Sequence, residues 1–124
     1  MKILVAEDEP ILLRMIEMRL RKDGYEVITT VNGREALTKI EEQEPDLIIA
    51  DIMMPFASGL EIVSIVKKKA VKVPVIILSA MEQESVVLEA FKLGADDYIT
   101  KPFSLNELSV RVKRFALIHV PRLS

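Results

Sequence analysis

The sequence contains no cysteine and no tryptophan, and its acidic and basic residues nearly balance. Without cysteine, the chain has no disulfide bond, thiolate nucleophile or zinc–thiolate site, which is compatible with a reducing cytoplasm. Seventeen basic and 19 acidic residues give a formal net charge of −2, so this segment is not expected to bind nucleic acid or a membrane surface. The apolar start of the chain is interrupted by Glu7, Asp8 and Glu9 and is neither a signal peptide nor a membrane span.

Five short runs are predicted to be strands. Three of them read Ile-Leu-Val-Ala, Leu-Ile-Ile-Ala and Val-Ile-Ile-Leu, and a run without polar residues is typical of a parallel strand covered on both faces. The length of 124 residues suits one domain, and half of the residues are hydrophobic, which is enough for a core. The predicted strands are Ile3–Ala6, Glu26–Thr30, Leu47–Ala50, Val75–Leu78 and Tyr98–Thr100.

A helix is predicted after each strand. The first begins at Pro10, carries a helical apolar stripe and stops near Gly24, and the fourth runs from about Glu82 to Leu93. The alternation predicts a flavodoxin-like (βα)5 fold, which is a doubly wound, five-stranded parallel sheet in the order 2-1-3-4-5 within a single domain. The other three helices begin with the capping-box patterns Asn32-x-x-Glu35, Ser58-x-x-Glu61 and Ser104-x-x-Glu107.

The residues that follow the strands carry the candidate chemistry. In this sheet order the carboxyl ends of strands one, three, four and five are neighbours, so the residues after them lie close together. Carboxylate oxygens suit Mg²⁺, a carboxylate is a nucleophile toward phosphorus, and ammonium and hydroxyl groups bind phosphoryl oxygens. Taken singly, each residue also has an ordinary explanation as a helix cap or a solvated loop residue. They are Glu7, Asp8 and Glu9, then Asp51, then Ser79, then Lys101.

As a set, these residues resemble the receiver domain of response regulators, over about residues 1–117. The resemblance implies that Asp51 accepts a phosphoryl group and that Mg²⁺ is held by Glu7, Asp8, Asp51 and the backbone carbonyl of Met53. The motifs that carry the resemblance are Glu7-Asp8, Asp51 with Met54-Pro55 and Gly59, Ser79-Ala80, Gly94-Ala95-Asp96-Asp97-Tyr98 and Lys101-Pro102-Phe103.

The resemblance also implies how the signal is passed on. Lys101, in a loop shaped by a cis bond to Pro102, would contact a phosphoryl oxygen. Ser79 would be the switch hydroxyl that moves to the phosphoryl group, and Tyr98 would be the aromatic switch residue that turns inward when Ser79 moves. The donor would be a histidine kinase or a small molecule such as acetyl phosphate.

The C-terminal part is similar to receivers of the OmpR/PhoB type, which usually precede a winged-helix DNA-binding domain. We expect a receiver at residues 1–118, a tail or the start of a linker at 119–124, and DNA binding through a domain outside this chain. Receivers of this type dimerise through the fourth helix, fifth strand and fifth helix, but Val87 stands where a lysine would pair with Glu107. The dimer-face residues implied are Asp96, Asp97, Glu107, Arg111 and Arg114, with Asp97–Arg111 and Asp96–Arg114 as ion pairs.

Other functions fit the sequence less well. A phosphatase of the haloacid dehalogenase type needs a second aspartate where Met53 stands. A pseudo-receiver would lack Asp51 or Lys101, and a nucleotide-binding protein of this fold would need a glycine-rich phosphate loop. A stand-alone receiver that acts by protein–protein contact remains open. We expect a signalling phosphoacceptor, not an enzyme, with a long-lived phosphoryl group because Met53 and Met81 flank the acceptor and hinder water.

Overall fold

The structure is a computed structural model that describes residues 1–120, and its centre is one parallel β-sheet of five strands in the order β2-β1-β3-β4-β5. The predicted fold is therefore confirmed, and each strand lies within one residue of its predicted bounds. Asp51 and Ser79, which were expected just after strands, are the last residues of theirs. The strands are β1 (Lys2–Ala6), β2 (Glu26–Thr30), β3 (Leu47–Asp51), β4 (Val75–Ser79) and β5 (Asp97–Thr100).

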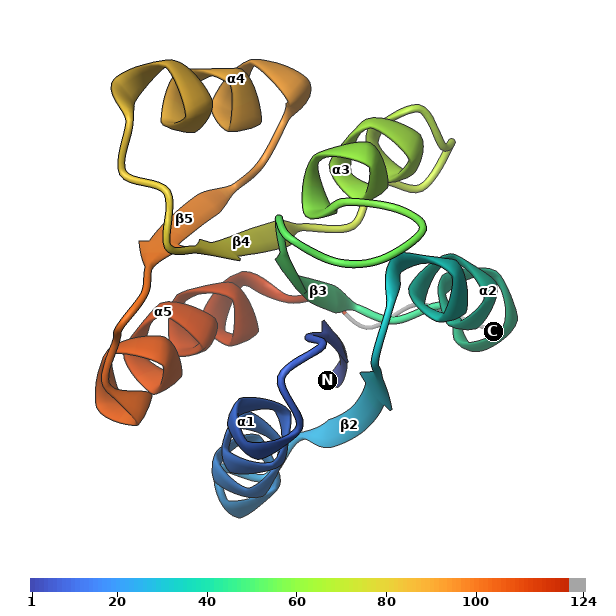
Figure 1. The fold of residues 1–124 in the computed structure, drawn as a ribbon. Helices are drawn as coiled ribbons and strands as arrows, with labels where there is room; N and C mark the ends of the chain where they lie inside the picture. The colour runs from blue at the N-terminus through green and yellow to red at the C-terminus, as the bar shows by residue number, and fades with distance from the viewer. Residues whose placement is uncertain (121–124) are drawn as a thin grey trace.

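Five helices cover the two faces of the sheet, as Figure 1 shows. One face carries α1 (Pro10–Lys22) and α5 (Leu105–Ile118), and the other carries α2 (Gly33–Gln43), α3 (Gly59–Lys67) and α4 (Glu84–Leu93). None of the helices among residues 1–120 has the length and apolar character needed to cross a membrane. Of the predicted tail, residues 121–124 lie outside the described part of the chain.

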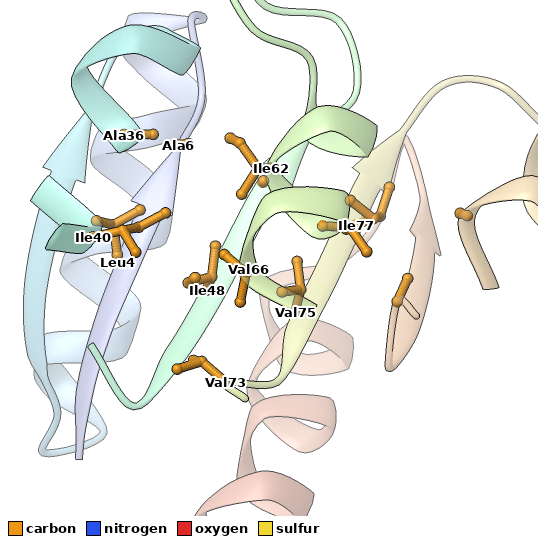
Figure 2. Packing of buried hydrophobic residues seen from close by; sticks show 14 of the residues in the cluster. Leu4, Ala6, Ala36, Ile40, Ile48, Ile62, Val66, Val73, Val75 and Ile77 are labelled. Atoms are coloured by element: carbon orange, nitrogen blue, oxygen red, sulfur yellow. The ribbon is translucent and has the colours of Figure 1, made fainter. Parts of the chain in front are cut away.

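The apolar strands form two cores, one on each side of the sheet. Leu4, Ile48 and Ile77 face α2, α3 and α4 (Figure 2), whereas Ile3 and Ile49 face α1 and α5. Successive residues of a strand point to opposite faces, so a strand buried on both faces has no place for a polar residue. The polar residues of the candidate site therefore lie at the last strand positions, as Asp51 and Ser79 do, or just beyond them.

The helix starts agree with the capping patterns in part. Ser58 and Glu61 form the complete reciprocal capping box at the start of α3. Asn32 and Ser104 each accept the predicted backbone N–H, but only this half of the box is formed at α2 and α5 within the described residues. The fourth helix was predicted from about Glu82 and begins at Glu84, two residues later. Gln83 stands at its N-cap position and makes no side-chain cap.

The β3–α3 loop contains a tight turn whose Pro55 carbonyl also binds the start of α2. The carbonyl of Pro55 accepts the N–H of Ala57 (3.0 Å), which closes a γ-turn around Phe56, and it also accepts the N–H of Gly33 (3.1 Å). Phe56 has a φ of 73°, a conformation that is strained for a bulky residue. Its ring is exposed, and the guanidinium of Arg34 lies 4.0 Å from the ring centroid. Contacts with Gly33 and Arg34 of α2 thus stabilise the strained conformation of this loop.

We predict that Gly59→Ala destabilises the protein by about 1–3 kcal/mol, because an added Cβ would lie 2.6 Å from the backbone oxygen of Asp51. That oxygen belongs to β3, so the clash cannot be relieved by turning a side chain. Urea unfolding measures the effect, and Ser64→Ala, on the same helix, is the control expected to leave stability unchanged or slightly raised. Equal stability of Gly59→Ala and the control would contradict the prediction.

Candidate functional site

Asp51 lies at the centre of the carboxyl edge of the sheet, because β3 is flanked there by β1 and β4. Its side chain is only 5% exposed. One carboxylate oxygen, Oδ1, accepts the N–H of Met53 (3.1 Å), and the other, Oδ2, accepts a hydrogen bond from Nζ of Lys101 (2.7 Å). The carboxylate is therefore oriented from both sides, with its remaining lone pairs directed toward the edge of the sheet.

Lys101 reaches three carboxylates from the loop after β5. Its Nζ lies 2.7 Å from Asp51 Oδ2, 2.8 Å from Glu7 Oε1 and 3.2 Å from Glu9 Oε2. Burial of the ammonium lowers its pKa, but the hydrogen bond to Asp51 and the pairing with Glu7 outweigh burial and raise the pKa of Lys101 above its usual range. The bond from Lys101 to Pro102 is cis, as the resemblance implied. Lys101 is thus a permanent cation beside the candidate acceptor.

Glu7 is completely buried at the end of β1. Its Oε2 accepts the N–H of Glu9 (3.3 Å), whereas Oε1 lies close to Lys101 without hydrogen-bond geometry and has no other hydrogen-bond partner. Burial raises the pKa of Glu7 to about 7; Lys101 opposes the shift and the charge of Asp51 adds to it. Pairing with Lys101 is therefore not enough to keep the pKa of Glu7 in its usual range.

The residues of the site fit a magnesium ion. Carboxylate oxygens of Glu7, Asp8 and Asp51 all lie within 4.8 Å of one another, and this is the one such group among the described residues. Glu7 Oε1 at the same place is buried and makes no hydrogen bond, although Nζ of Lys101 lies 2.8 Å away, so this oxygen has acceptor capacity that a metal ion could use. An all-oxygen ligand set suits a hard cation that keeps part of its water shell, which describes Mg²⁺. Asp8 is exposed and open to such an ion.

An open hollow of about 310 Å³ gives access to Asp51. Met53 borders it, and its side chain is 62% exposed. Met81 is half-buried and packs against the core beneath α4, away from the residues that line the hollow. Of the two methionines expected to flank the acceptor, Met53 is therefore the one at the entrance. The lining residues are Asp8, Glu9, Asp51, Met53, Ala80 and Lys101.

Ser79 and Tyr98 meet at the backbone of Met81. The buried hydroxyl oxygen of Ser79 accepts the N–H of Met81 (2.9 Å), and the hydroxyl of Tyr98 donates to the carbonyl of Met81 (2.7 Å). Tyr98 is buried and thus already lies in the inward position that the resemblance assigns to the switched form. One residue of the β4–α4 loop links the two candidate switch side chains.

The charged residues of the expected dimer face pair within the chain. Arg111 lies 2.8 Å from Asp97 Oδ1, and Arg114 lies 3.9 Å from Asp97 Oδ2. The carboxylate of Asp96 accepts hydrogen bonds from Lys67 of α3 (2.7 Å) and from a backbone N–H of β4, while Arg114 reaches the carbonyl of Asp96 instead (3.3 Å). The Asp97–Arg111 partnership thus exists within one chain, and Asp96 serves to fasten α3 to β5.

The same face presents apolar side chains. Leu88 and Phe91 of α4 are exposed, and Glu107 is exposed in the first turn of α5. Val87, where the resemblance implied a lysine, is half-buried and packs against the core. Because valine is apolar, Val87 cannot form an ion pair with Glu107.

The sequence patterns did not assign a role at the site to Glu9. Acidic residues after a strand are ordinary helix caps, and this role had been considered for Glu9 at the start of α1. In the structure its carboxylate makes no capping bond and pairs with Lys101. The run of three acidic residues at positions 7 to 9 was the available signal, but it does not specify which direction each side chain takes.

Comparison with known proteins identifies related sequences over most of the chain. The profile of the response regulator receiver domain matches residues 3–113. The alkaline phosphatase synthesis transcriptional regulatory protein PhoP of Bacillus subtilis (strain 168) is 41% identical over 112 residues, which are 90% of this chain and 47% of that protein. The chain thus spans about half the length of this curated relative.

Solved structures agree in fold. TrrA of Thermotoga maritima, a response regulator solved in complex with Mg²⁺ and BeF, has a TM-score of 0.82 and 38% identity, over 92% of this chain and 97% of that chain. DrrB of Thermotoga maritima, described as an OmpR/PhoB homologue, has a TM-score of 0.86 and 35% identity, over 94% of this chain and 52% of that chain. The similarity to the OmpR/PhoB type is therefore seen in both sequence and structure.

We predict that the free energy of unfolding of the metal-free protein falls as the pH rises from about 4.5 to about 7, by on the order of 1 kcal/mol per pH unit at the steepest point. The folded state holds a proton on Glu7 in this range more tightly than the unfolded state, because the pKa of Glu7 is raised from 4.5 to about 7. Glu7→Gln removes this dependence, which urea unfolding in a metal chelator measures.

The control for this prediction is Glu26→Gln, which removes an exposed carboxylate at the opposite end of the sheet. It should keep the pH dependence of the original protein. Identical pH profiles for Glu7→Gln and the original protein would show that Glu7 does not titrate in this way.

Proposed function

The chain belongs to the family of response regulator receiver domains, and from this premise we propose that it accepts a phosphoryl group from a histidine kinase on Asp51. The observation that carries the proposal is the setting of Asp51, which is buried between the ammonium of Lys101 at 2.7 Å and the acidic pair Glu7 and Asp8. A carboxylate held in this way is a nucleophile with a cation ready to bind the charge that arrives with a phosphoryl group.

In the proposed reaction an oxygen of Asp51 attacks the phosphorus atom of the donor, and the bond from phosphorus to the donor atom breaks. Lys101 turns from Asp51 Oδ2 to a phosphoryl oxygen and neutralises part of its charge. Glu7, Asp8, Asp51 and the carbonyl of Met53 would hold Mg²⁺, which when bound offsets the repulsion between the carboxylates and the incoming phosphoryl group. The product is an acyl phosphate on Asp51, which is a stored signal.

The signal would be read through Ser79. A phosphoryl group on Asp51 offers the Ser79 hydroxyl a new acceptor, and moving toward it would break the bond that Ser79 makes with the N–H of Met81. Tyr98 holds the carbonyl of the same residue, so the position of the β4–α4 loop and of α4 would change with it. Phosphorylation thus shifts the population between two arrangements of this face.

We further propose that the altered face, formed by α4, β5 and α5, pairs with a second copy of the chain. Leu88 and Phe91 of α4 supply exposed apolar area there, and Arg111 and Asp97 supply charges that can exchange partners. In a longer protein such a dimer would bring two DNA-binding domains together, in the cytoplasm. The alternative is a receiver that acts alone, by binding other proteins through this face.

A turnover phosphatase is the less favoured candidate. Its second aspartate would be needed at Met53, which donates its backbone N–H to Asp51 but has no acidic side chain. A pseudo-receiver is also less favoured, since Asp51 and Lys101 are both present and in contact.

Asp51→Asn should abolish labelling by acetyl phosphate in Mg²⁺, because a neutral amide is a poor nucleophile. Intact-mass spectrometry measures the gain of one phosphoryl group. Asp23→Asn, which alters a carboxylate beside α5, is the control expected to be labelled normally. Labelling of Asp51→Asn at the normal rate would exclude Asp51 as the acceptor.

The phosphoryl group should be long-lived, since the Met53 side chain stands at the entrance to the hollow and offers no hydrogen bond to an attacking water. Met53→Asn should shorten its lifetime by up to about tenfold, because an amide can orient water beside the phosphorus atom. Decay of the purified labelled protein in Mg²⁺ is followed by mass spectrometry. Loss of the label within seconds in the original protein would refute the explanation.

A further inference from the structure

Glu9 occupies the N-cap position of α1, yet its carboxylate does not cap the helix. A side chain at this position ordinarily accepts a backbone N–H of the first turn. The carboxylate of Glu9 instead accepts a hydrogen bond from Nζ of Lys101 at 3.2 Å. This choice of partner places a further negative charge beside Asp51, in addition to the acidic pair that would hold the metal.

The carboxylate of Glu9 lies at the mouth of the site. It borders the hollow above Asp51, and it borders the neighbouring hollow in front of Phe103 as well. Its side chain is 63% exposed, whereas that of Lys101 is 17% exposed. A donor must therefore pass the charge of Glu9 to reach Asp51, and the phosphoryl group must compete with Glu9 for Lys101.

We propose that Glu9 is a specificity-determining residue, whose negative charge raises the barrier to phosphoryl transfer from small anionic donors by an amount proportional to the charge of the donor. The inference rests on the proposed function of Asp51. A small phosphorylated anion brings its full charge to the mouth, and repulsion there raises the barrier to transfer. A phosphorylated histidine on a protein partner can bring cationic side chains of its own, which offset Glu9.

Two small donors of different charge separate this effect from others. Acetyl phosphate is a dianion at neutral pH, and its P–O bond breaks as Asp51 forms its own P–O bond, so acetate leaves with the electron pair. Phosphoramidate is a monoanion whose nitrogen already carries the needed proton, so its P–N bond breaks and ammonia leaves. The two reactions share the acceptor and differ in the charge that meets Glu9.

The experiment measures initial labelling rates at saturating Mg²⁺ and low ionic strength. Glu9→Gln should be labelled about two- to tenfold faster than the original protein by acetyl phosphate, and the gain with phosphoramidate should be about the square root of that factor. Both gains should shrink at about 1 M salt, where charges are screened beyond about 3 Å. Glu9→Asp keeps the charge and should stay closer to the original protein than Glu9→Gln does.

Binding of beryllofluoride, an anion that takes the place of the phosphoryl group, gives a second readout without turnover. In the presence of Mg²⁺ it should bind Glu9→Gln more tightly than the original protein, as measured by calorimetry. The matched control is Glu26→Gln, which removes the same charge at the opposite end of the sheet and should leave rates and binding unchanged.

Equal or slower labelling of Glu9→Gln, or the same gain with both donors, would overturn the inference. If the original protein is labelled and Glu9→Gln is labelled at the same rate, the inference about Glu9 is overturned and the proposed function of Asp51 stands. Failure of both donors to label the original protein would overturn the proposed function of Asp51 as well.

Discussion

The ammonium of Lys101 sets the electrostatic balance of the molecule's functional edge. It lies within 3.2 Å of carboxylates from Glu7, Glu9 and Asp51, of which two are buried. Burial raises the pKa of Glu7, repulsion from Asp51 adds to the shift, and Lys101 only partly opposes it. Because the lysine follows β5 while its partners follow β1 and end β3, this balance also ties together strands that are far apart in the sequence. A second cation or a bound anion changes all of these contacts at once.

The coupling between the acceptor and the outer surface passes through few groups. Ser79 and Tyr98 hold the N–H and the carbonyl of one residue, Met81. Neither bond can be lost without leaving a partly buried backbone group unpaired, so the loop has a small number of acceptable arrangements. This is the property that a two-state switch requires: discrete alternatives in place of a graded deformation.

The fold could be predicted from the sequence because the strands are apolar throughout and because turn and capping residues separate them from the helices. The strand order then predicted that Asp51 and Lys101 lie close together, and in the structure Lys101 donates a hydrogen bond to Asp51. Sequence patterns do not determine which of several partners a charged side chain selects. Asp96 was expected to face Arg114 and its carboxylate instead contacts Lys67, and Glu9 was considered as a helix cap and contacts Lys101. Such choices depend on distances that arise when the helices pack.

The start of α4 was misjudged for a related reason. Residues 82 and 83 continue the helical pattern, but the loop before them is held by hydrogen bonds to Ser79 and Tyr98. A tertiary constraint on the preceding residues therefore delays the helix, and no local pattern records it.

The shared carbonyl of Pro55 has an evolutionary consequence. It accepts N–H groups from Ala57 of its own loop and from Gly33 at the start of α2, and a side chain at position 33 would collide with the backbone of Ala57. Neither loop can gain or lose a residue without displacing the other. Insertions and deletions in these two loops should therefore have been accepted together during divergence.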